Sequence, residues 1–299
     1  MQLGNQNNFS ASFLKNNMLV RLIYVNLALF AIIKVLFLVF WLMQGGSSPN
    51  EWAQNYLAIP SDLSQLILRP WTLITYMFLH LDIWHLLGNM LWLYFLGQLF
   101  VQFLGERKLY TVYLAGGLAG ASLYILFFNI FPVFESISSS AIALGASASV
   151  MAVVVAIGTY SPNYEVRLFG MLAVKLKYIA LFSFIMDVLR ISNSNSGGHI
   201  AHIGGAILGF FFAKQWLKGK DITKWAGTSS DFLMAIFKPR KKNPMKVKYK
   251  RESGDKYEYK DRKQDEQASI DIVLDKISRS GYDSLSKKEK ELLFKASGK

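Results

Sequence analysis

Six apolar runs, in which charged residues are scarce, make up most of this chain. The hydrophobic share of 52% would also suit a soluble domain, so the distribution carries the inference. A helix that crosses a bilayer needs about 17–25 predominantly apolar residues. Most of the runs reach or approach that length, but the fourth is too short to cross alone. The pattern predicts an all-α polytopic membrane protein with six transmembrane helices, from residues 18–44, 84–103, 108–131, 147–160, 173–191 and 200–217.

The basic residues between these runs fall mainly on one side of the predicted membrane. One set of connections holds Lys15, Arg21, Arg107, Lys108, Arg167, Lys175 and Lys177, whereas the other set holds only Arg69 and Arg190. Positively charged loops stay in the cytoplasm. We therefore expect both termini to be cytoplasmic. The first run is longer than a signal-peptide core and lacks a small-residue cleavage site, so we expect it to be a retained helix.

The net charge of +13 is concentrated in the tail. Residues 214–299 carry 23 of the 33 basic and 13 of the 20 acidic residues. A basic tail beside a membrane span favours anionic lipid over nucleic acid as a partner. A solvated cytoplasmic segment that follows the charge rule explains the same composition, and both interpretations stay open.

The tail also changes character along its length. Residues 228–238 resemble a short interfacial helix, 239–266 read as a polar linker, and 268–297 restore helical periodicity, with Ser284 or Ser286 as a possible cap. We expect a small C-terminal helical hairpin with a docking role. The predicted organisation is a cytoplasmic segment (1–17), a six-helix domain (18–217), a basic segment with linker (218–266) and a helical segment (267–299).

The connection 45–83 is too apolar for an ordinary solvated loop. It contains Trp52 and Trp71, a residue type that favours the headgroup region of a bilayer. We expect it to insert into the membrane interface.

The four histidines fall in two clusters beside or inside predicted spans, where titratable groups are costly and suggest function. In the first cluster, His80 precedes His85, and His85 and Asn89 are four residues apart on one helix face. Both side chains can donate a hydrogen bond to a developing oxyanion. Polar packing between helices is the alternative interpretation.

The second cluster pairs His199 and His202 with a G-x-x-x-G formed by Gly205 and Gly209. Small residues four apart allow another helix to approach closely. Since His202 lies three residues before Gly205, a close helix partner could bring a serine to its imidazole. The G-x-x-x-G alone is a weak signal.

Ser147 opens the short run 147–160. A helix of about 15 residues rises only ~22 Å against ~30 Å of hydrocarbon, so Ser147 is predicted to lie at a helix N-terminus below the outer surface. Amides at such an end can bind an oxyanion, and Gly145 leaves room for a substrate backbone. A capping or packing role for Ser147 is the alternative.

Together these elements supply a nucleophile, a base and oxyanion donors, the set that acyl transfer requires. Asp187 reads as a helix-end residue paired with Arg190, so a Ser147/His202 dyad without a carboxylate is the simpler inference. The chain has no cysteine, which excludes a cysteine nucleophile. We expect no metal and no other cofactor.

The motifs H-x-x-x-x-H-x-x-x-N (80–89), G-A-S (145–147) and A-H-x-G-G-x-x-x-G (201–209) resemble those of rhomboid intramembrane proteases, in the same order. The segment R-P-W-T-L-I-T-Y-M-F-L-H (69–80) and the G-x-x-x-G at 116–120 strengthen the resemblance, which covers about residues 18–217. The C-terminal hairpin resembles an accessory segment of some bacterial rhomboids from the Bacteroidetes group.

The resemblance implies a six-helix bundle in a bacterial inner membrane that cleaves transmembrane protein substrates near small residues. It assigns Ser147 as nucleophile, His202 as base, His85 and Asn89 as oxyanion donors, and His80, Gly145, Gly205 and Gly209 as structural residues near the site. Departures from the family pattern are Ala148 in place of Gly, Met151 in place of an aromatic residue, Thr72 after Trp71, and Val101 in place of Glu.

Three other functions remain to be weighed. A catalytically silent rhomboid-like binding protein usually lacks the serine or the histidine, but both are present here. A metal or haem protein could use paired histidines, yet it would leave the Ser147 segment unexplained. A transporter would suit broken helices, but no internal repeat is evident. Metalloprotease and aspartyl protease mechanisms lack their HExxH motif and paired aspartates.

Overall fold

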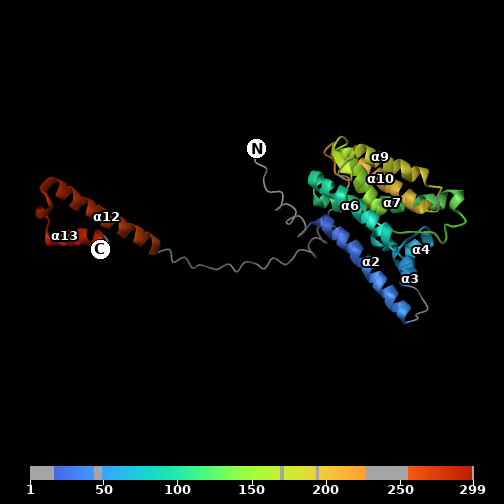
Figure 1. The fold of residues 1–299 in the computed structure, drawn as a ribbon, viewed down its shortest axis with the longest axis horizontal. Coiled ribbons are helices and arrows are strands. Elements are labelled where there is room, and N and C mark those ends of the chain that lie inside the picture. Colours follow the sequence, from blue (N-terminus) through green and yellow to red (C-terminus); the bar gives the residue numbers. More distant parts are fainter. Residues whose placement is uncertain (1–16, 44–48, 169–171, 193–194, 227–254, 298–299) are drawn as a thin grey trace. The chain divides into compact units, whose positions relative to one another are not determined.

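The computed structural model describes residues 17–43, 49–168, 172–192, 195–226 and 255–297. The chain divides into two compact units, Met1–Lys238 and Pro239–Lys299, and each is described by itself. Both units are mainly helical (Figure 1). The predicted interfacial helix at 228–238 lies outside the described residues.

Four helices of the first unit are long and apolar enough to cross a membrane: α2 (Met18–Leu42), α6 (Ile83–Leu104), α7 (Glu106–Ile130) and α10 (Ser196–Trp216). Two shorter apolar helices, α8 (Ser147–Tyr160) and α9 (Leu176–Leu189), have 14 residues each. The six predicted runs therefore all contain a helix, but only four reach a spanning length individually.

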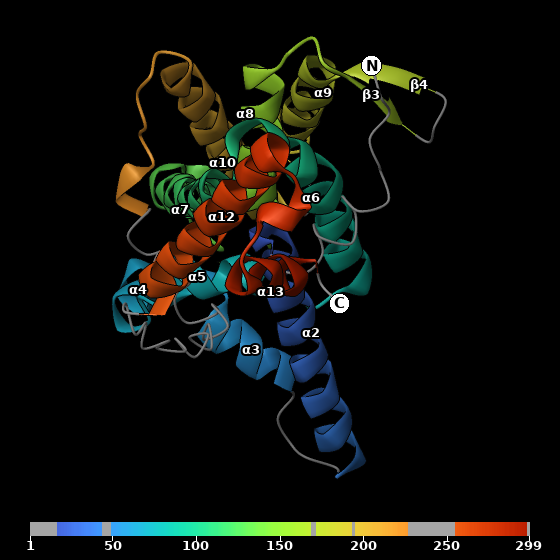
Figure 2. The same cartoon turned by 90° about the vertical axis from the view of Figure 1, so that its left-hand side faces the viewer.

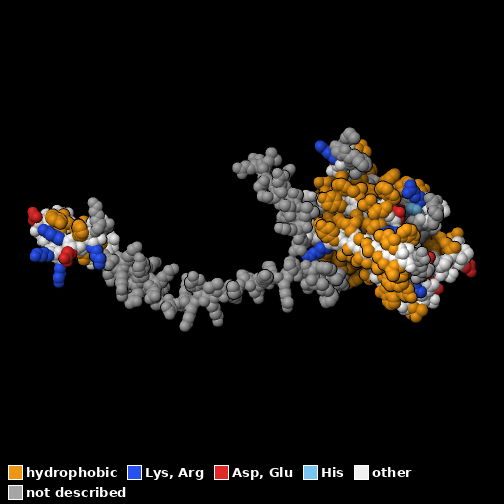
Figure 3. Space-filling model, turned by 60° about the horizontal axis from the view of Figure 1, so that its bottom comes forward, with side chains coloured by type: hydrophobic (Ala, Val, Ile, Leu, Met, Phe, Trp, Pro, Cys, Tyr) orange, Lys and Arg blue, Asp and Glu red, His pale blue; other side chains and the backbone are white. Residues whose placement is uncertain are grey.

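Large apolar side chains remain exposed on this unit, especially along α2 and α6. Figure 3 shows hydrophobic side chains over much of the visible face. Lipid, unlike water, makes such exposure favourable, while the helices satisfy their own backbone hydrogen bonds. Together with the four long apolar helices, this surface identifies a multi-pass membrane protein.

The short helix α8 packs against α6, α7, α9 and α10, and Figure 2 shows it beside α9. Two glycines of α10 allow its backbone to approach that of α8 closely. A Cβ on Gly205 would lie 2.1 Å from the carbonyl oxygen of Ala148, and one on Gly209 would lie 2.3 Å from that of Ala152. The predicted packing of the G-x-x-x-G of α10 on this helix is thus observed.

The connection between α2 and α6 is a chain of short elements: α3 (Pro49–Leu57), β1 (Ile59–Pro60), α4 (Leu63–Leu68), α5 (Thr72–Thr75) and η1 (Tyr76–Phe78). β1 pairs antiparallel with β2 (Ile142–Ala143), which follows η2 (Pro132–Phe134). This pairing ties the connection to the backbone that leads into α8. Trp52 and Trp71 are both about half exposed, at 55% and 48%.

Between α8 and α9 the chain forms a hairpin of β3 (Glu165–Leu168) and β4 (Leu172–Lys175). The sequence predicted that the fifth helix begins at residue 173. The first residues of that run instead belong to β4, and α9 begins at Leu176. Val166 and Val174 pair across the hairpin, and β-branched residues favour such pairing. After α10, η3 (Lys224–Ala226) ends the described part of this unit.

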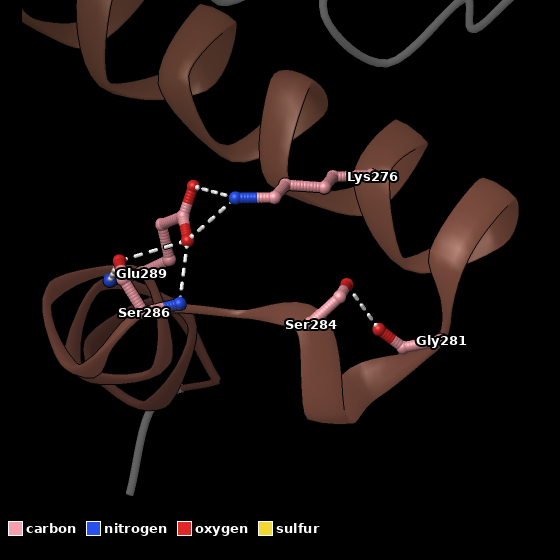
Figure 4. Close-up of polar contacts among 5 residues, drawn as sticks. All are labelled: Lys276, Gly281, Ser284, Ser286 and Glu289. Carbon is pink, nitrogen blue, oxygen red and sulfur yellow. Dashed lines mark hydrogen bonds and ion pairs between the residues drawn. The ribbon is translucent and has the colours of Figure 1, made fainter.

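The second unit contains α12 (Asp255–Ser280), η4 (Tyr282–Ser284) and α13 (Lys287–Ala296). The first helix begins at Asp255, so the predicted linker over 239–266 is too long at its C-terminal end. Ser286 caps α13, which was one of the two predicted caps. Figure 4 shows the contacts: Glu289 accepts hydrogen bonds from the Ser286 backbone and from Lys276, the latter at 2.9 and 3.1 Å.

Acid is expected to weaken the start of α13. The Ser286 backbone N–H, Lys276 and the Ser286 hydroxyl lower the pKa of Glu289 to about 2. Because the pKa of Glu289 is lower in the folded chain than its ordinary value, the ionised carboxylate stabilises the fold at pH values above that ordinary value. This stabilisation is lost as the pH falls toward 2. Glu289→Gln should therefore reduce amide-exchange protection of α13 at pH 6 much more than at pH 3. Glu291→Gln on the same helix is the control, and an equal loss at both pH values would contradict the prediction.

Candidate active site

Ser147 and His202 meet at the contact between α8 and α10. The imidazole Nε2 of His202 lies 2.6 Å from Oγ of Ser147, a hydrogen-bond distance at which the hydroxyl donates to the ring nitrogen. The two residues are 55 positions apart in sequence, and the close approach of Gly205 to Ala148 brings their helices together. Both side chains are partly exposed.

Ser147 is the first residue of α8, and the preceding Ala146 provides no side-chain cap. The first amides of a helix have no intrahelical acceptor, and together with the helix dipole they favour an anion. Ser147 therefore lies at an electropositive backbone end, as its sequence position predicts.

Gly145 shapes the approach to this helix end. Its φ of +118° is unfavourable for residues with a side chain. Its amide donates to the carbonyl of Tyr76 at 2.8 Å. A Cβ on this residue would lie 2.6 Å from Cε1 of His85, so the imidazole of His85 packs directly against the loop before Ser147.

His80 forms a hydrogen bond to the same loop and is itself bonded to Asn89. Nε2 of the buried His80 accepts hydrogen bonds from the Ala146 amide at 3.3 Å and from the Asn89 side chain at 3.2 Å. The Asn89 amide also donates to the carbonyl of His85 at 2.9 Å. The structure thus brings the three residues of the first cluster to one side of Ser147.

Asp187 on α9 completes the group, which the sequence did not predict. Its Oδ1 lies 2.9 Å from Nδ1 of His202 and 2.8 Å from Nδ1 of His199. The expectation that Asp187 serves only a helix end beside Arg190, leaving the base without a carboxylate, is wrong. The available signal was a carboxylate on the neighbouring predicted span, in the same half of the membrane as both histidines.

Comparisons with known proteins agree with this geometry. The Rhomboid domain family matches residues 68–219. The chain belongs to the rhomboid family. "RHOMBOID-like protein 12, mitochondrial" from Arabidopsis thaliana is 32% identical over 159 residues, which are 50% of this chain and 47% of that protein. The chain thus matches about half of the length of this curated relative. Residues 255–299 match a family of unknown function (DUF6576).

One departure from the rhomboid pattern has a local explanation. Ala148 takes the place of the glycine that usually follows the serine, and its methyl group needs space. Gly120 on α7 provides it, because a Cβ there would lie 2.6 Å from the Cβ of Ala148. The helix that carries Ser147 is therefore accommodated without loss of the contact with α10.

The rhomboid domain also contains a group that could hold a metal. Ligand atoms of Asp187, His199 and His202 lie within 4.8 Å of one another. The two other histidines do not join this group: Nε2 of His80 already accepts hydrogen bonds from Asn89 and Ala146. A centre that uses all four histidines, as a metal or haem protein would need, is not formed by the described residues.

Proposed function

We propose that this rhomboid is an intramembrane serine endopeptidase that cleaves transmembrane segments of other membrane proteins. The observation that carries the proposal is the 2.6 Å contact between Nε2 of His202 and Oγ of Ser147 at the N-terminus of a helix. This is the arrangement of an activated nucleophile and its base. The proposed substrates are apolar spans with small, helix-destabilising residues near the cleavage site.

The proposed reaction has two stages. Oγ of Ser147 attacks the scissile carbonyl carbon while its proton moves to Nε2 of His202, and the carbonyl oxygen becomes an oxyanion. The protonated imidazole then gives the proton to the leaving amine, the peptide C–N bond breaks, and an acyl-enzyme remains. Water attacks the ester with the same imidazole as base, which releases the new carboxylate and restores the serine.

The amide of Ser147 and the side chains of His85 and Asn89 are the proposed oxyanion donors. The ring of His85 contacts the loop at Gly145, directly before the nucleophile. Both amide hydrogens of Asn89 are engaged in the free protein, and the bond to His80, at 3.2 Å, is the longer one. Catalytic hydrogen bonds often form fully only with substrate bound. We therefore propose that Asn89 gives up its hydrogen bond to His80 and donates to the oxyanion instead.

Loss of one oxyanion donor should lower kcat. Asn89→Ala is expected to reduce kcat by about 10²- to 10³-fold, measured with a fluorogenic peptide that carries one apolar span interrupted by small residues. Asn26→Ala is the matched control, because this buried asparagine on α2 bonds the Leu22 carbonyl far from Ser147 in sequence. It should lower thermal stability and leave kcat unchanged. Unaltered kcat in Asn89→Ala would refute its role.

The proposed topology has six spans with both termini in the cytoplasm of a bacterial cell, in the inner membrane. The 14 residues of α8 rise only ~21 Å. If its last turn reaches the cytoplasmic face, Ser147 lies below the outer surface in a hydrated pocket. We further propose that the basic segment after residue 217 contacts anionic lipid and that the helical segment 267–299 binds a partner.

A catalytically silent rhomboid-like membrane binding protein is the competing function. Reaction with a fluorophosphonate probe distinguishes the two, because labelling requires an activated serine. We expect label on the peptide that contains Ser147 in the wild-type protein and none in His202→Asn. Absence of label on Ser147 under conditions that label a known serine hydrolase would favour the silent protein.

A further inference from the structure

One oxygen of Asp187 faces both histidines of α10. Its Oδ1 lies 2.9 Å from Nδ1 of His202 and 2.8 Å from Nδ1 of His199. The carboxylate is only 10% exposed, and a buried carboxylate is costly unless it accepts hydrogen bonds. Each imidazole is therefore favoured in the form that carries a proton on Nδ1, because that proton can be donated to this oxygen.

We propose that Asp187 is a positioning residue for His202, and that His199 fixes the carboxylate in place. This inference rests on the proposed function and extends it from two residues to four: Ser147, His202, Asp187 and His199. Ser147 and His202 react, whereas Asp187 and His199 act through the imidazole.

The tautomer of His202 decides whether its Nε2 can accept a proton. Neutral imidazole carries one proton, and a hydrogen bond at one nitrogen decides where that proton lies. With the proton on Nδ1 facing Asp187, the lone pair of Nε2 faces the hydroxyl of Ser147 at 2.6 Å. That tautomer alone can accept the proton of the nucleophile.

The charge of His202 changes during the proposed reaction. When Ser147 transfers its proton, the ring of His202 becomes a cation. A carboxylate 2.9 Å from Nδ1 stabilises that cation without having to move. Asp187 keeps its own charge throughout, so no proton is transferred to it.

The carboxylate of Asp187 is held by a second residue of α10. His199 and His202 are three residues apart on α10 and therefore share one face of that helix. Asp187 lies two residues before the end of α9, on the neighbouring helix. His199 donates to the same oxygen, and two donors restrict the carboxylate more than one.

The distances favour a hydrogen-bond network over a metal site. Two ligands of a tetrahedral zinc ion, each at about 2.0 Å from the metal, are ~3.3 Å apart. The carboxylate oxygen lies at 2.8 and 2.9 Å from the two nitrogens, within the range of charge-assisted hydrogen bonds. Loss of activity on treatment with a chelator, restored by zinc alone, would overturn the proposal.

The kinetic test uses the full chain in detergent micelles with the fluorogenic span peptide. Asp187→Asn keeps the shape of the side chain and should lower kcat on the order of 10²-fold, with little change in KM or in the unfolding midpoint. Asp187→Glu should recover part of the loss. In a His202→Asn background, Asp187→Asn should not lower kcat further, because the effects of substituting residues that act as a unit are not additive.

The matched control is Asp221→Asn, which removes a second partly buried carboxylate. Asp221 forms an ion pair with Lys108, far in sequence from the nucleophile. This variant should lower the unfolding midpoint and leave kcat unchanged. An Asp187→Asn protein that behaves in the same way would show that Asp187 has only a structural role.

A second measurement does not depend on activity. In protein labelled with ¹⁵N-histidine, the NMR signals of His202, assigned with His202→Asn, should report a proton on Nδ1. Asp187→Asn should abolish this preference, and a fixed Nδ1 tautomer in that variant would overturn the proposal. Absence of cleavage and probe labelling in the wild type would refute the proposed protease function instead, while the tautomer still decides whether Asp187 orients the imidazole.

Discussion

Ser147→Ala is expected to abolish cleavage of the fluorogenic span peptide, with a loss on the order of 10⁴-fold or more in kcat. The reason is chemical: without the hydroxyl, no acyl-enzyme can form, and the imidazole of His202 has no proton to remove at 2.6 Å. The unfolding midpoint should change little, since Ser147 is partly exposed and contributes one hydrogen bond to a neighbour.

Ser149→Ala is the matched control for this prediction. Ser149 lies on the same helix two residues further along, and its buried hydroxyl has no hydrogen-bond partner. Removing that hydroxyl should leave kcat within about twofold of the wild type and should not lower stability, because no bond is lost. Cleavage by Ser147→Ala at the wild-type rate would end the protease proposal.

Gly205→Val is expected to have the largest effect on the fold. A Cβ at this position would lie 2.1 Å from the carbonyl oxygen of Ala148, which belongs to the backbone and cannot rotate away. The helices α8 and α10 must then separate, at a cost of about 3 kcal/mol or more. Since Ser147 precedes Ala148 and His202 lies one turn before Gly205, probe labelling of Ser147 should be lost together with stability.

Measurement of the unfolding midpoint in micelles, alongside probe labelling, tests this prediction. Gly88→Ala on α6 is the control, because a Cβ there meets nothing within 4 Å. It should leave the midpoint and the labelling rate close to those of the wild type. An unchanged midpoint in Gly205→Val would mean that α10 does not pack on α8 through this residue.

Much of the membrane unit could be predicted from local patterns. Apolar runs located α2, α6, α7, α8, α9 and α10, because lipid-exposed and core-facing positions are both apolar in such helices. The Ser147–His202 contact could also be anticipated. Gly205 and Gly209 indicated where α10 approaches another helix closely, and the resemblance to rhomboid proteases implied that Ser147 lies beside His202.

Asp187 could not be assigned correctly from the sequence, for a different physical reason. Its contacts with His199 and His202 depend on how α9 lies against α10, and no periodicity within α9 encodes that arrangement. A carboxylate near a helix end and near Arg190 is equally compatible with a surface ion pair. Only tertiary packing distinguishes the two.

The boundary of α12 was missed because its first turns, from Asp255, are strongly charged and lack an apolar stripe. Such composition is typical of both linkers and solvent-exposed helices. In the second unit, Ser286, one of the two serines predicted as a possible cap, caps α13, and Glu289 three residues later completes a capping box.

The strand pair β1–β2 has a mechanical consequence. Ile59 and Pro60 pair with Ala143 and Ile142, only a few residues before Gly145 and Ser147. A movement of the α3–α4 segment must therefore either break this pairing or pull on the backbone beside Ser147. The position of that segment and the position of Ser147 are in this way coupled through two residues on each strand.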